Sequence, residues 1–291
     1  MEQEKKKGKL PPWLRRRIGC GDTFDHTSSA LSDLGVETIC NHANCPNKGE
    51  CWSRGTATVL ILGGTCTRNC KFCSVAPGKP LPPDPTEPMR VAKLAAEMKL
   101  KYIVITSVTR DDLPDGGAAH FRDTVLETKK AVPGIEIELL VPDFKGCQQQ
   151  AIEILAEAMP FVFGHNIETV SEMFPVVRSG GDYQRSLDLL KMVKEQYPDI
   201  PTKSSMMLGI GENDAQILQT LKDLRANGVD RVALGQYLKS EAEAVEVAEY
   251  VTPEKFEFWD TVARDMGFKW VMSSPYTRSS YHAETETGKV E

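Results

Sequence analysis

Short apolar runs alternate with amphipathic stretches along most of the chain. Six of these runs are too short for helices and therefore predict strands. They cover residues 58–62, 102–106, 135–141, 161–163, 204–208 and 231–234. Between them, apolar residues recur at helical spacing within 91–98, 152–159, 186–193 and 217–224. Strands and helices in alternation predict a parallel sheet with crossover helices.

The number of strand–helix units bears on the shape of this sheet. Six units, against the eight of a closed barrel, predict an α/β fold: a partial, open (β/α)6 TIM-like barrel with N-terminal and C-terminal extensions. We divide the chain into an N-terminal extension at 1–55, the barrel at 56–250 and a C-terminal part at 251–291. The last part contains a further predicted helix at 253–266 and a strand at 269–272. In barrels of this kind the chemistry gathers at the carboxyl ends of the strands.

The segment before the first strand gives fewer predictions. Residues 10–18 carry two prolines near their start and predict a short helix. Its arginines, Arg15, Arg16 and Arg17, form either a solvated face or a docking patch for an acidic partner. Residues 27–35 predict a brief helical turn. Residues 1–7 lack an apolar core and carry acids, so they are neither a secretory signal nor a good transit peptide.

Composition and charge exclude several classes of function. The formal net charge of −6 argues against a general nucleic-acid binder, and no stretch approaches the ~18 apolar residues of a membrane span. Eight cysteines are too sparse in 291 residues for a disulfide scaffold. Six of them fall in two tight groups, which favours metal binding in a reducing cytosol. We therefore expect a cytoplasmic protein that binds neither nucleic acid nor membrane.

The first of these groups lies in the loop that follows the first predicted strand. Cys66, Cys70 and Cys73 have the spacing C-x3-C-x2-C, directly after Gly63 and Gly64. A structural zinc site takes four protein ligands, whereas a cubane iron–sulfur cluster held by three thiolates keeps one iron free for a small molecule. The spacing resembles that of radical S-adenosylmethionine (SAM) enzymes. A zinc site completed from elsewhere and disulfide bonds are the alternatives.

The second cysteine group precedes the first strand. Cys40, Cys45 and Cys51 have the spacing C-x4-C-x5-C in a stretch dense in Asn, Gly and Pro, which predicts a loop rather than a helix. His42 could complete a zinc site, but at two residues from Cys40 we expect it to turn away. Two separate groups of three cysteines favour two clusters over two incomplete zinc sites.

Polar and glycine-rich segments follow the other predicted strands. They occupy residues 107–113, 165–169, 209–212 and 235–238. Such segments suit a polar ligand that approaches the backbone closely, although each one could also be an ordinary loop or a helix cap. Asn166 and Glu168 could hydrogen-bond a ribose. Cys20 and Cys147 stand alone in the sequence, so we expect them to be dispensable for metal binding.

Taken together, these features resemble the lipoyl synthase family. The resemblance covers residues 35–284 and is carried by both cysteine groups, by 104–113, by 165–170 and by the Arg-Ser-Ser-Tyr sequence at 278–281. Two segments depart from the family pattern. Residues 273–277 read Ser-Ser-Pro-Tyr-Thr instead of Ser-Gly-Pro-Leu-Val, and the stretch after Leu238 lacks the usual proline-rich sequence. These departures concern substrate contacts rather than the clusters.

The resemblance implies two [4Fe-4S] clusters and SAM as cofactors. The cluster on Cys66, Cys70 and Cys73 binds SAM, and one electron from a ferredoxin- or flavodoxin-like donor cleaves it to a 5′-deoxyadenosyl radical. That radical takes hydrogen from C6 or C8 of an octanoyl chain on a lysine of a lipoyl carrier domain. The auxiliary cluster donates the sulfur, and two turnovers of SAM give both carbon–sulfur bonds.

The resemblance also implies the remaining site residues and partners. The ligands of the auxiliary cluster are Cys40, Cys45, Cys51 and Ser280. The SAM contacts that we expect are Thr106, Ser107, Arg110, Asn166 and Glu168. The implied partners are the octanoylated lipoyl carrier domain, the electron donor and a cluster-assembly carrier.

Two other functions compete with this interpretation. The first is another radical SAM sulfur inserter, of the biotin-synthase or tRNA-thiolating kind. The position of the second cysteine group before the radical loop, the serine tail and the negative charge count against it. The second is a non-enzymatic binding module whose fold is stabilised by structural zinc. Metal analysis separates that case, because it requires zinc without sulfide.

Overall fold

The computed structural model describes residues 10–15 and 21–283. Its main sheet has seven parallel strands in the order β1-β4-β5-β6-β7-β8-β9, and β1 and β9 form its edges. The strands are β1 (Thr58–Ile61), β4 (Tyr102–Ser107), β5 (Glu136–Leu140), β6 (Val162–Gly164), β7 (Thr202–Leu208), β8 (Arg231–Gln236) and β9 (Trp270–Ser274). All six predicted strands of the open barrel are confirmed. The predicted C-terminal strand pairs with β8 as a seventh.

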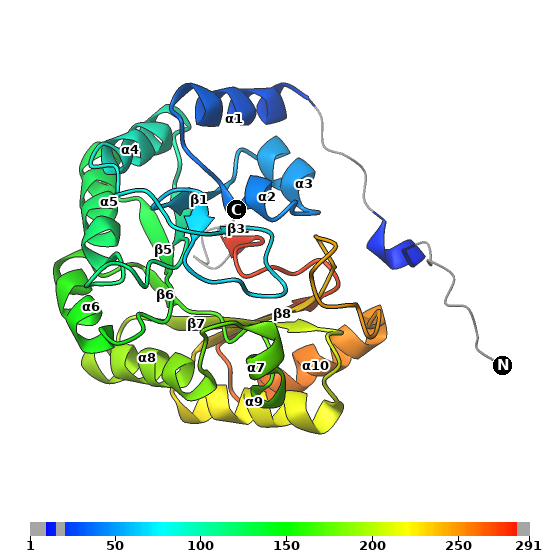
Figure 1. Ribbon diagram of the computed structural model, residues 1–291. Helices are drawn as coiled ribbons and strands as arrows, with labels where there is room; N and C mark the ends of the chain where they lie inside the picture. The colour runs from blue at the N-terminus through cyan, green and yellow to red at the C-terminus, as the bar shows by residue number, and fades with distance from the viewer. Residues whose placement is uncertain (1–9, 16–20, 284–291) are drawn as a thin grey trace.

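Helices surround this sheet on its outer side (Figure 1). They are α4 (Glu87–Glu97), α5 (Ala118–Ala131), α6 (Gln148–Leu155), α7 (Phe174–Val177), α8 (Tyr183–Gln196), α9 (Asp214–Ala226) and α10 (Pro253–Asp265), with 3-10 turns η2 (Ala156–Ala158) and η3 (Ser171–Met173). The sequence pattern did not indicate α5. Its buried face includes His120, Thr124 and Thr128 beside Phe121 and Val125, so the apolar period is broken. The hydroxyl of Thr124 donates to the carbonyl of His120, which lets a polar residue be buried there.

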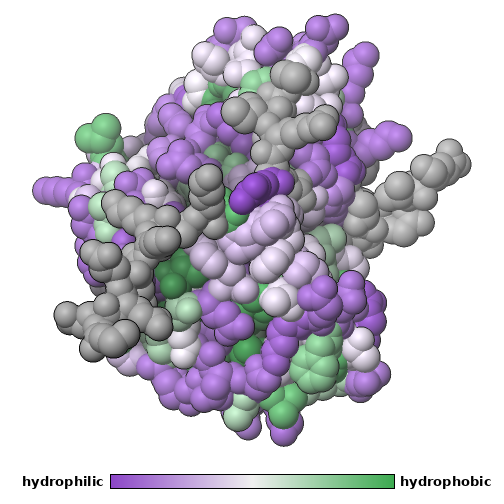
Figure 2. Space-filling view, turned by 90° about the vertical axis from the view of Figure 1, so that its right-hand side faces the viewer, coloured by the Kyte–Doolittle hydropathy of each residue, from purple (hydrophilic) through white to green (hydrophobic). Residues whose placement is uncertain are grey.

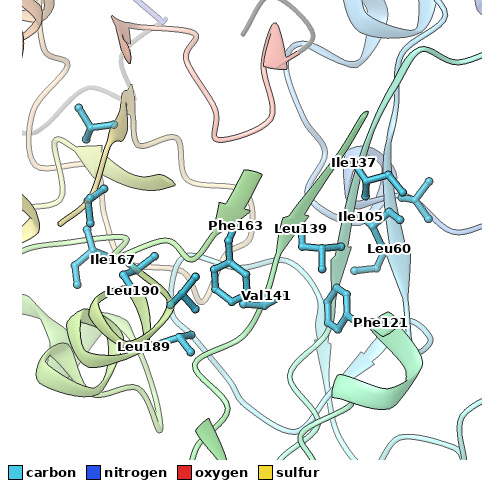
Figure 3. Packing of buried hydrophobic residues seen from close by; sticks show 14 of the residues in the cluster. Leu60, Ile105, Phe121, Ile137, Leu139, Val141, Phe163, Ile167, Leu189 and Leu190 are labelled. Atoms are coloured by element: carbon cyan, nitrogen blue, oxygen red, sulfur yellow. The ribbon is translucent and has the colours of Figure 1, made fainter. Parts of the chain in front are cut away.

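The core lies between the sheet and these helices. Ile105, Ile137 and Leu139 of neighbouring strands pack with Phe121 of α5, as Figure 3 shows. One hydrophobic cluster runs from Ala30 to Val271. The packing is therefore continuous across both boundaries of the predicted three-part division, at 55/56 and 250/251. The separate roles of the three parts stay a prediction.

The inner face of the barrel is more polar than the outer face. Side chains alternate along a strand, so Glu138 points opposite to Ile137 and Leu139. Its carboxylate is fully buried. It accepts a hydrogen bond from the Tyr102 hydroxyl at 2.8 Å and forms an ion pair with Lys203 at 3.1 Å. Both contacts are needed because a buried carboxylate is stable only when it is paired.

The N-terminal segment is more helical than the sequence indicated. The prediction of a loop at 40–52 is wrong, because α2 (Ile39–His42) and α3 (Lys48–Ser53) occupy most of it. Asn and Pro are concentrated in the short connection between them, and the hydroxyl of Thr38 caps α2 by accepting from the Asn41 N–H at 3.3 Å. The predicted turn at 27–35 belongs to a longer helix, α1 (Asp22–Asp33).

This segment also protects an edge of the sheet. Thr38 forms an antiparallel bridge with Val59, and the carbonyl of Glu37 accepts from the N–H of Leu60 at 2.8 Å. The backbone groups of β1 are thereby paired on the side that has no neighbouring strand. Of the predicted helix at 10–18, the structure contains the 3-10 turn η1 (Pro12–Leu14), and residues 16–18 lie outside the described part of the chain.

One face of the molecule carries mostly polar side chains. Figure 2 shows the face that lies on the right of Figure 1, and hydrophilic residues cover most of its coloured area, with hydrophobic ones in separate groups. Across the described residues, no helix combines the length and the apolar content needed to cross a membrane.

Candidate active site

The loop with the first cysteine group leaves β1 through a sharp turn. Leu62 and Gly63 have φ angles of 67° and 85°, in the left-handed region that non-glycine residues rarely occupy. Two contacts hold Leu62 in this conformation. Its N–H donates to Glu87 at 2.7 Å, and its side chain lies so close to Gly117 that a Cβ there would be 2.5 Å from it. The turn directs the loop across the carboxyl ends of the strands.

Arg68 anchors this loop between its first two cysteines. Its guanidinium, with 4% of the side chain exposed, donates two hydrogen bonds to Asp111 at 2.7 and 2.8 Å and two to Asp143 at 2.7 and 3.0 Å. Asp143 also accepts from Arg185 at 2.8 and 2.9 Å. These carboxylates raise the pKa of Arg68, although burial alone would lower it. The loop is therefore tied to the ends of β4 and β5 and to α8.

The three thiols of the loop are partly buried and separate. All seven cysteines within the described residues are free, which excludes the disulfide alternative in this structure. Burial raises the pKa of Cys70 to about 12 and that of Cys73 to about 11. Both groups are therefore neutral at pH 7 without a metal, and a cluster must displace their protons to bind.

A small two-stranded sheet shapes the rest of this loop. It pairs β2 (Thr65–Cys66) with β3 (Ala76–Pro77) in parallel. A cavity of about 420 Å³ opens beside Cys70 and Cys73, and it is also lined by the β3 strand and by Glu241 and Glu243. This volume lies within the range of small-molecule sites.

A group of polar residues faces the same loop from the end of β6. Asn166 donates to the carboxylate of Glu168 at 3.1 Å, and the backbone of Glu168 has a φ of 69°. Arg178 donates to the Asn166 carbonyl at 2.7 Å and contacts His165 at 3.3 Å. Burial raises the pKa of Glu168, and the charge of Arg178 opposes this. Arg178 also lowers the pKa of Cys70 against the effect of burial, so it lies close to the thiols.

Sequence reasoning missed Arg68 and Arg178. Arg178 follows an ordinary helical stretch, and the pattern offered no reason to place it beside Asn166, twelve positions away. Buried arginines generally need acidic or carbonyl partners, but such partners are identified only once the fold is known. For Arg68 the one available indication was its position inside the C-x3-C-x2-C loop.

The three predicted SAM contacts at the end of β4 and just after it lie in different environments. The hydroxyl of Thr106 donates to the carbonyl of Leu140 at 2.8 Å, whereas the buried hydroxyl of Ser107 has no hydrogen-bond partner among the described residues. Arg110 is buried and pairs with Asp112 at 2.8 and 2.9 Å. None of the five predicted contact residues lines the cavity of about 420 Å³. Their contact with SAM stays a prediction.

The second cysteine group meets the C-terminal tail at the other end of β1. Cys40, Cys45 and Cys51 line one small cavity of about 50 Å³ together with Ser280 and Thr58. Tyr102, at the start of β4, lines the same cavity. The Thr58 hydroxyl donates to the Ser280 oxygen at 2.7 Å, which joins residues 222 positions apart. Three cysteines and one serine therefore line the same cavity, and their role as ligands of an auxiliary cluster stays a prediction.

The tail that carries Ser280 is fastened to the N-terminal segment. The hydroxyl of Tyr281 donates to Glu50 of α3 at 3.0 and 3.1 Å, and His282 contacts the same carboxylate at 3.2 Å. Arg54 lies 2.7 Å from the other ring nitrogen of His282. Figure 1 shows this tail in red at the centre of the ring, beside α2 and α3. These contacts of Tyr281 and His282 keep Ser280 at the cavity.

The spacing of the side chains bears on the zinc alternative. A zinc ion at 2.3 Å from each sulfur draws thiolates to within about 4 Å of each other. In the described ranges no three His, Cys, Asp or Glu side chains converge closely enough to hold one metal ion. His42 lies against the carboxylate of Glu37 at 3.0 Å and is not among the residues lining the cavity with Cys40.

The isolated cysteines and the arginine patch are only partly described. Cys147 caps α6 and lies 3.6 Å from the carbonyl of Phe144, and it lines neither cavity. Arg15 is exposed, and its side chain donates to the carbonyl of Leu10 at 3.1 Å. Cys20, Arg16 and Arg17 lie outside the described residues.

Comparison with known proteins identifies the family. The model of the Radical SAM superfamily matches residues 60–224. A lipoyl synthase of Pseudoalteromonas atlantica is 48% identical over 282 residues, covering 97% of this chain and 88% of that protein. A second lipoyl synthase, from Caldanaerobacter subterraneus subsp. tengcongensis, is 49% identical and covers 94% of this chain and 95% of that protein. The chain belongs to the lipoyl synthase family.

Membership in the lipoyl synthase family makes the protein a radical SAM enzyme that inserts sulfur. Enzymes of this superfamily carry a [4Fe-4S] cluster and use SAM. The crystal structure of Streptococcus suis SuiB bound to its precursor peptide shares the fold at a TM-score of 0.56 and 11% identity. That match covers 86% of this chain and 52% of SuiB, so the chain spans about half of the SuiB length.

Proposed function

We propose that the protein inserts two sulfur atoms, at C6 and C8 of an octanoyl chain bound to a carrier protein, and so forms the lipoyl group. The observation that carries this proposal is the meeting of Ser280 with Cys40, Cys45 and Cys51 at one cavity. It supports a second cluster site besides the cysteine loop. When bound, the radical-loop cluster supplies the electron that cleaves SAM, and the auxiliary cluster supplies the sulfur.

The two sites stand at opposite ends of β1. The radical loop follows its last residue, Ile61, and the auxiliary cavity is lined by its first, Thr58. The three steps of strand from Thr58 to Ile61 span about 10 Å at 3.3 Å each, which is comparable to an extended eight-carbon chain. This spacing supports a substrate that lies between the sites, with its carbons within reach of both.

The residues around the radical loop have separate tasks in this proposal. Cys66, Cys70 and Cys73 hold the first cluster, and the Arg68 anchor keeps their loop in place. Asn166 and Glu168 offer hydrogen bonds to the polar groups of SAM. A carbon radical is quenched by water and stray hydrogen donors, so the bound substrate must close the site against them.

The proposed partners follow from the substrate and the cofactors. They are an octanoylated lipoyl carrier domain, a ferredoxin- or flavodoxin-like electron donor and a cluster-assembly carrier. We assign residues 1–55 to the auxiliary ligands, 56–250 to the radical SAM barrel and 251–291 to the tail with Ser280. The exposed Arg15 belongs to the proposed docking patch for an acidic carrier domain.

Anaerobic turnover with SAM, a reductant and an octanoyl-lysine peptide, followed by mass spectrometry, tests the proposal. We expect a peptide that has gained two sulfur atoms, together with 5′-deoxyadenosine. Cys45→Ala should still form 5′-deoxyadenosine but leave the octanoyl chain without sulfur, because only the auxiliary site is damaged. Cys147→Ala is the matched control and should behave as the wild type. Stoichiometric zinc without labile sulfide contradicts the proposal.

A further inference from the structure

Thr58 contacts two of the four ligands assigned to the auxiliary cluster. Its hydroxyl donates to the Ser280 oxygen at 2.7 Å. Its backbone also lies beside Cys40 in the same cavity, where burial raises the pKa of the Cys40 thiol and the Thr58 backbone opposes this. With 6% of its surface exposed at the start of β1, Thr58 is held by the sheet rather than by the cluster site. The position of Thr58 therefore does not depend on the cluster, and both contacts start from a residue that the sheet holds in place.

The tail is anchored on both sides of Ser280 by contacts that do not involve its side chain. Before it, Asn47 donates to the carbonyl of Tyr276 at 2.7 Å. After it, Tyr281 is bonded to Glu50, and Ala283 is buried to 1% exposure. Ser280 can therefore exchange one partner for another by a change of side-chain rotamer while the tail stays in place.

A hydrogen bond to an oxygen ligand draws electron density away from the metal. Partners of this kind around metal ligands typically change metal affinity by about 10–100-fold. An alkoxide on a cluster iron is already a hard ligand in a soft site. When the iron leaves, the Ser280 hydroxyl remains in a part-buried position, where a hydroxyl without a hydrogen-bond partner carries a free-energy penalty. Thr58 removes this penalty because its hydroxyl lies within hydrogen-bond distance of the Ser280 oxygen.

We propose that Thr58 is a positioning residue that makes Ser280 a releasable ligand of the auxiliary cluster. In the release step the iron–oxygen bond would break with its electron pair on Ser280, which would take a proton from solvent. The bonds from that iron to the cluster sulfides would break with their electron pairs on sulfur, so that the iron would leave as a hydrated cation with no change of oxidation state. Thr58 weakens the bond beforehand and satisfies the serine hydroxyl afterwards. This inference rests on the proposed function, since it requires the cluster at this site.

Thr58→Val tests the inference, because it removes the hydroxyl while keeping the shape of the side chain and the backbone beside Cys40. The protein is reconstituted anaerobically in a Cys66→Ala/Cys70→Ala/Cys73→Ala background, so that only the auxiliary cluster forms. Release of iron to bipyridyl is followed by absorbance. We expect about tenfold slower release of the most labile iron, and Thr58→Ser should restore the wild-type rate.

The matched control is Thr202→Val. Thr202 is also buried at the start of a strand, β7, and its hydroxyl donates to the carbonyl of Gly228 at 3.1 Å, away from either cavity. It should leave iron release unchanged. Release from Thr58→Val at the wild-type rate, or faster, overturns the inference, as does a failure of Thr58→Ser to restore it.

Ser280→Ala separates this inference from the proposed function. It should release one iron faster than the wild type, and adding Thr58→Val to it should change nothing further, because the two residues act through one bond. If Ser280→Ala does not alter iron content or release, then Ser280 is not a ligand and the proposed cluster site fails. If Ser280→Ala accelerates release but Thr58→Val has no effect, only the role of Thr58 is overturned.

Discussion

Replacing Arg68 by methionine should loosen the radical loop and destabilise the whole protein. The change keeps an unbranched apolar stem but removes four charge-assisted hydrogen bonds, two to Asp111 and two to Asp143. Asp143, whose side chain is 0% exposed, keeps Arg185 as a partner, and Asp111 is 28% exposed and can be hydrated. Arg68 lies between Cys66 and Cys70, so the loss falls directly on the cluster ligands.

The size of the effect follows from burial. Breaking a buried ion pair by removing one partner typically costs about 3–5 kcal/mol, and the lower end applies because Arg185 still neutralises Asp143. For a chain of this size, about 3 kcal/mol corresponds to a fall in Tm of roughly 6 °C. Because the loop loses its anchor, we also expect about tenfold weaker iron retention at the radical-loop site.

Two measurements check this prediction. Thermal unfolding of the cluster-free protein gives the change in Tm, and iron retention against a chelator, in a Cys45→Ala background, reports on the radical loop alone. Arg122→Met is the control, because Arg122 is 30% exposed, pairs with Asp123 on the surface of α5 and should shift Tm by less than about 2 °C. An Arg68→Met protein with the Tm and iron retention of the wild type would refute the reasoning.

Four further predictions follow from single positions. Burial lowers the pKa of His165 to about 3 in the folded protein, against about 6.5 in the unfolded chain. The neutral ring therefore contributes fully to the free energy of unfolding above pH 6.5, and this contribution is lost as the pH falls. Urea unfolding should therefore show about 2 kcal/mol less stability from this residue at pH 5, and His165→Gln should remove that dependence. Gly235→Ala should displace the tail and lower auxiliary iron, since its Cβ would lie 2.0 Å from the carbonyl oxygen of Thr277. In Gly267→Ala the Cβ meets nothing within 4 Å, so the φ of 84° strains only the local backbone, and the protein should retain full iron content. Cys147→Ala should retain all iron in anaerobic iron and sulfide analysis, and half the iron lost would show a wrong ligand assignment. Arg15→Glu should raise KM for a carrier domain but not for a short octanoyl-lysine peptide, and equal effects on both would point to a folding defect.

The barrel was predictable because each of its strands and most of its helices depend on the pattern of a few neighbouring residues. Apolar runs such as 102–106 and helical spacing such as 91–98 each depend on a few neighbouring residues, and β4 and α4 follow them closely. The loop prediction at 40–52 failed because the short helices α2 and α3 are stabilised by capping and by packing of Trp52, which is 2% exposed. Tertiary contact decided this segment rather than composition.

The candidate site likewise has a part that local sequence predicts and a part that only the fold brings together. The two cysteine groups are visible as local spacings, and the family resemblance implied Ser280. The bond between Thr58 and Ser280 joins residues 222 positions apart, and the bonds between Arg68 and Asp143 join residues 75 positions apart. No periodicity encodes such pairs, because they depend on which strand ends the fold brings together. The supporting residues therefore emerged only from the structure.

The origin of the inserted sulfur is the most direct test of the account. Protein reconstituted with heavy-isotope sulfide, freed of unbound sulfide, is given SAM, reductant and octanoyl-lysine peptide for a single round of product formation. If the cluster on Cys40, Cys45, Cys51 and Ser280 donates the sulfur, mass spectrometry should find two heavy sulfur atoms in each lipoyl product. A product that carries only light sulfur would contradict the account.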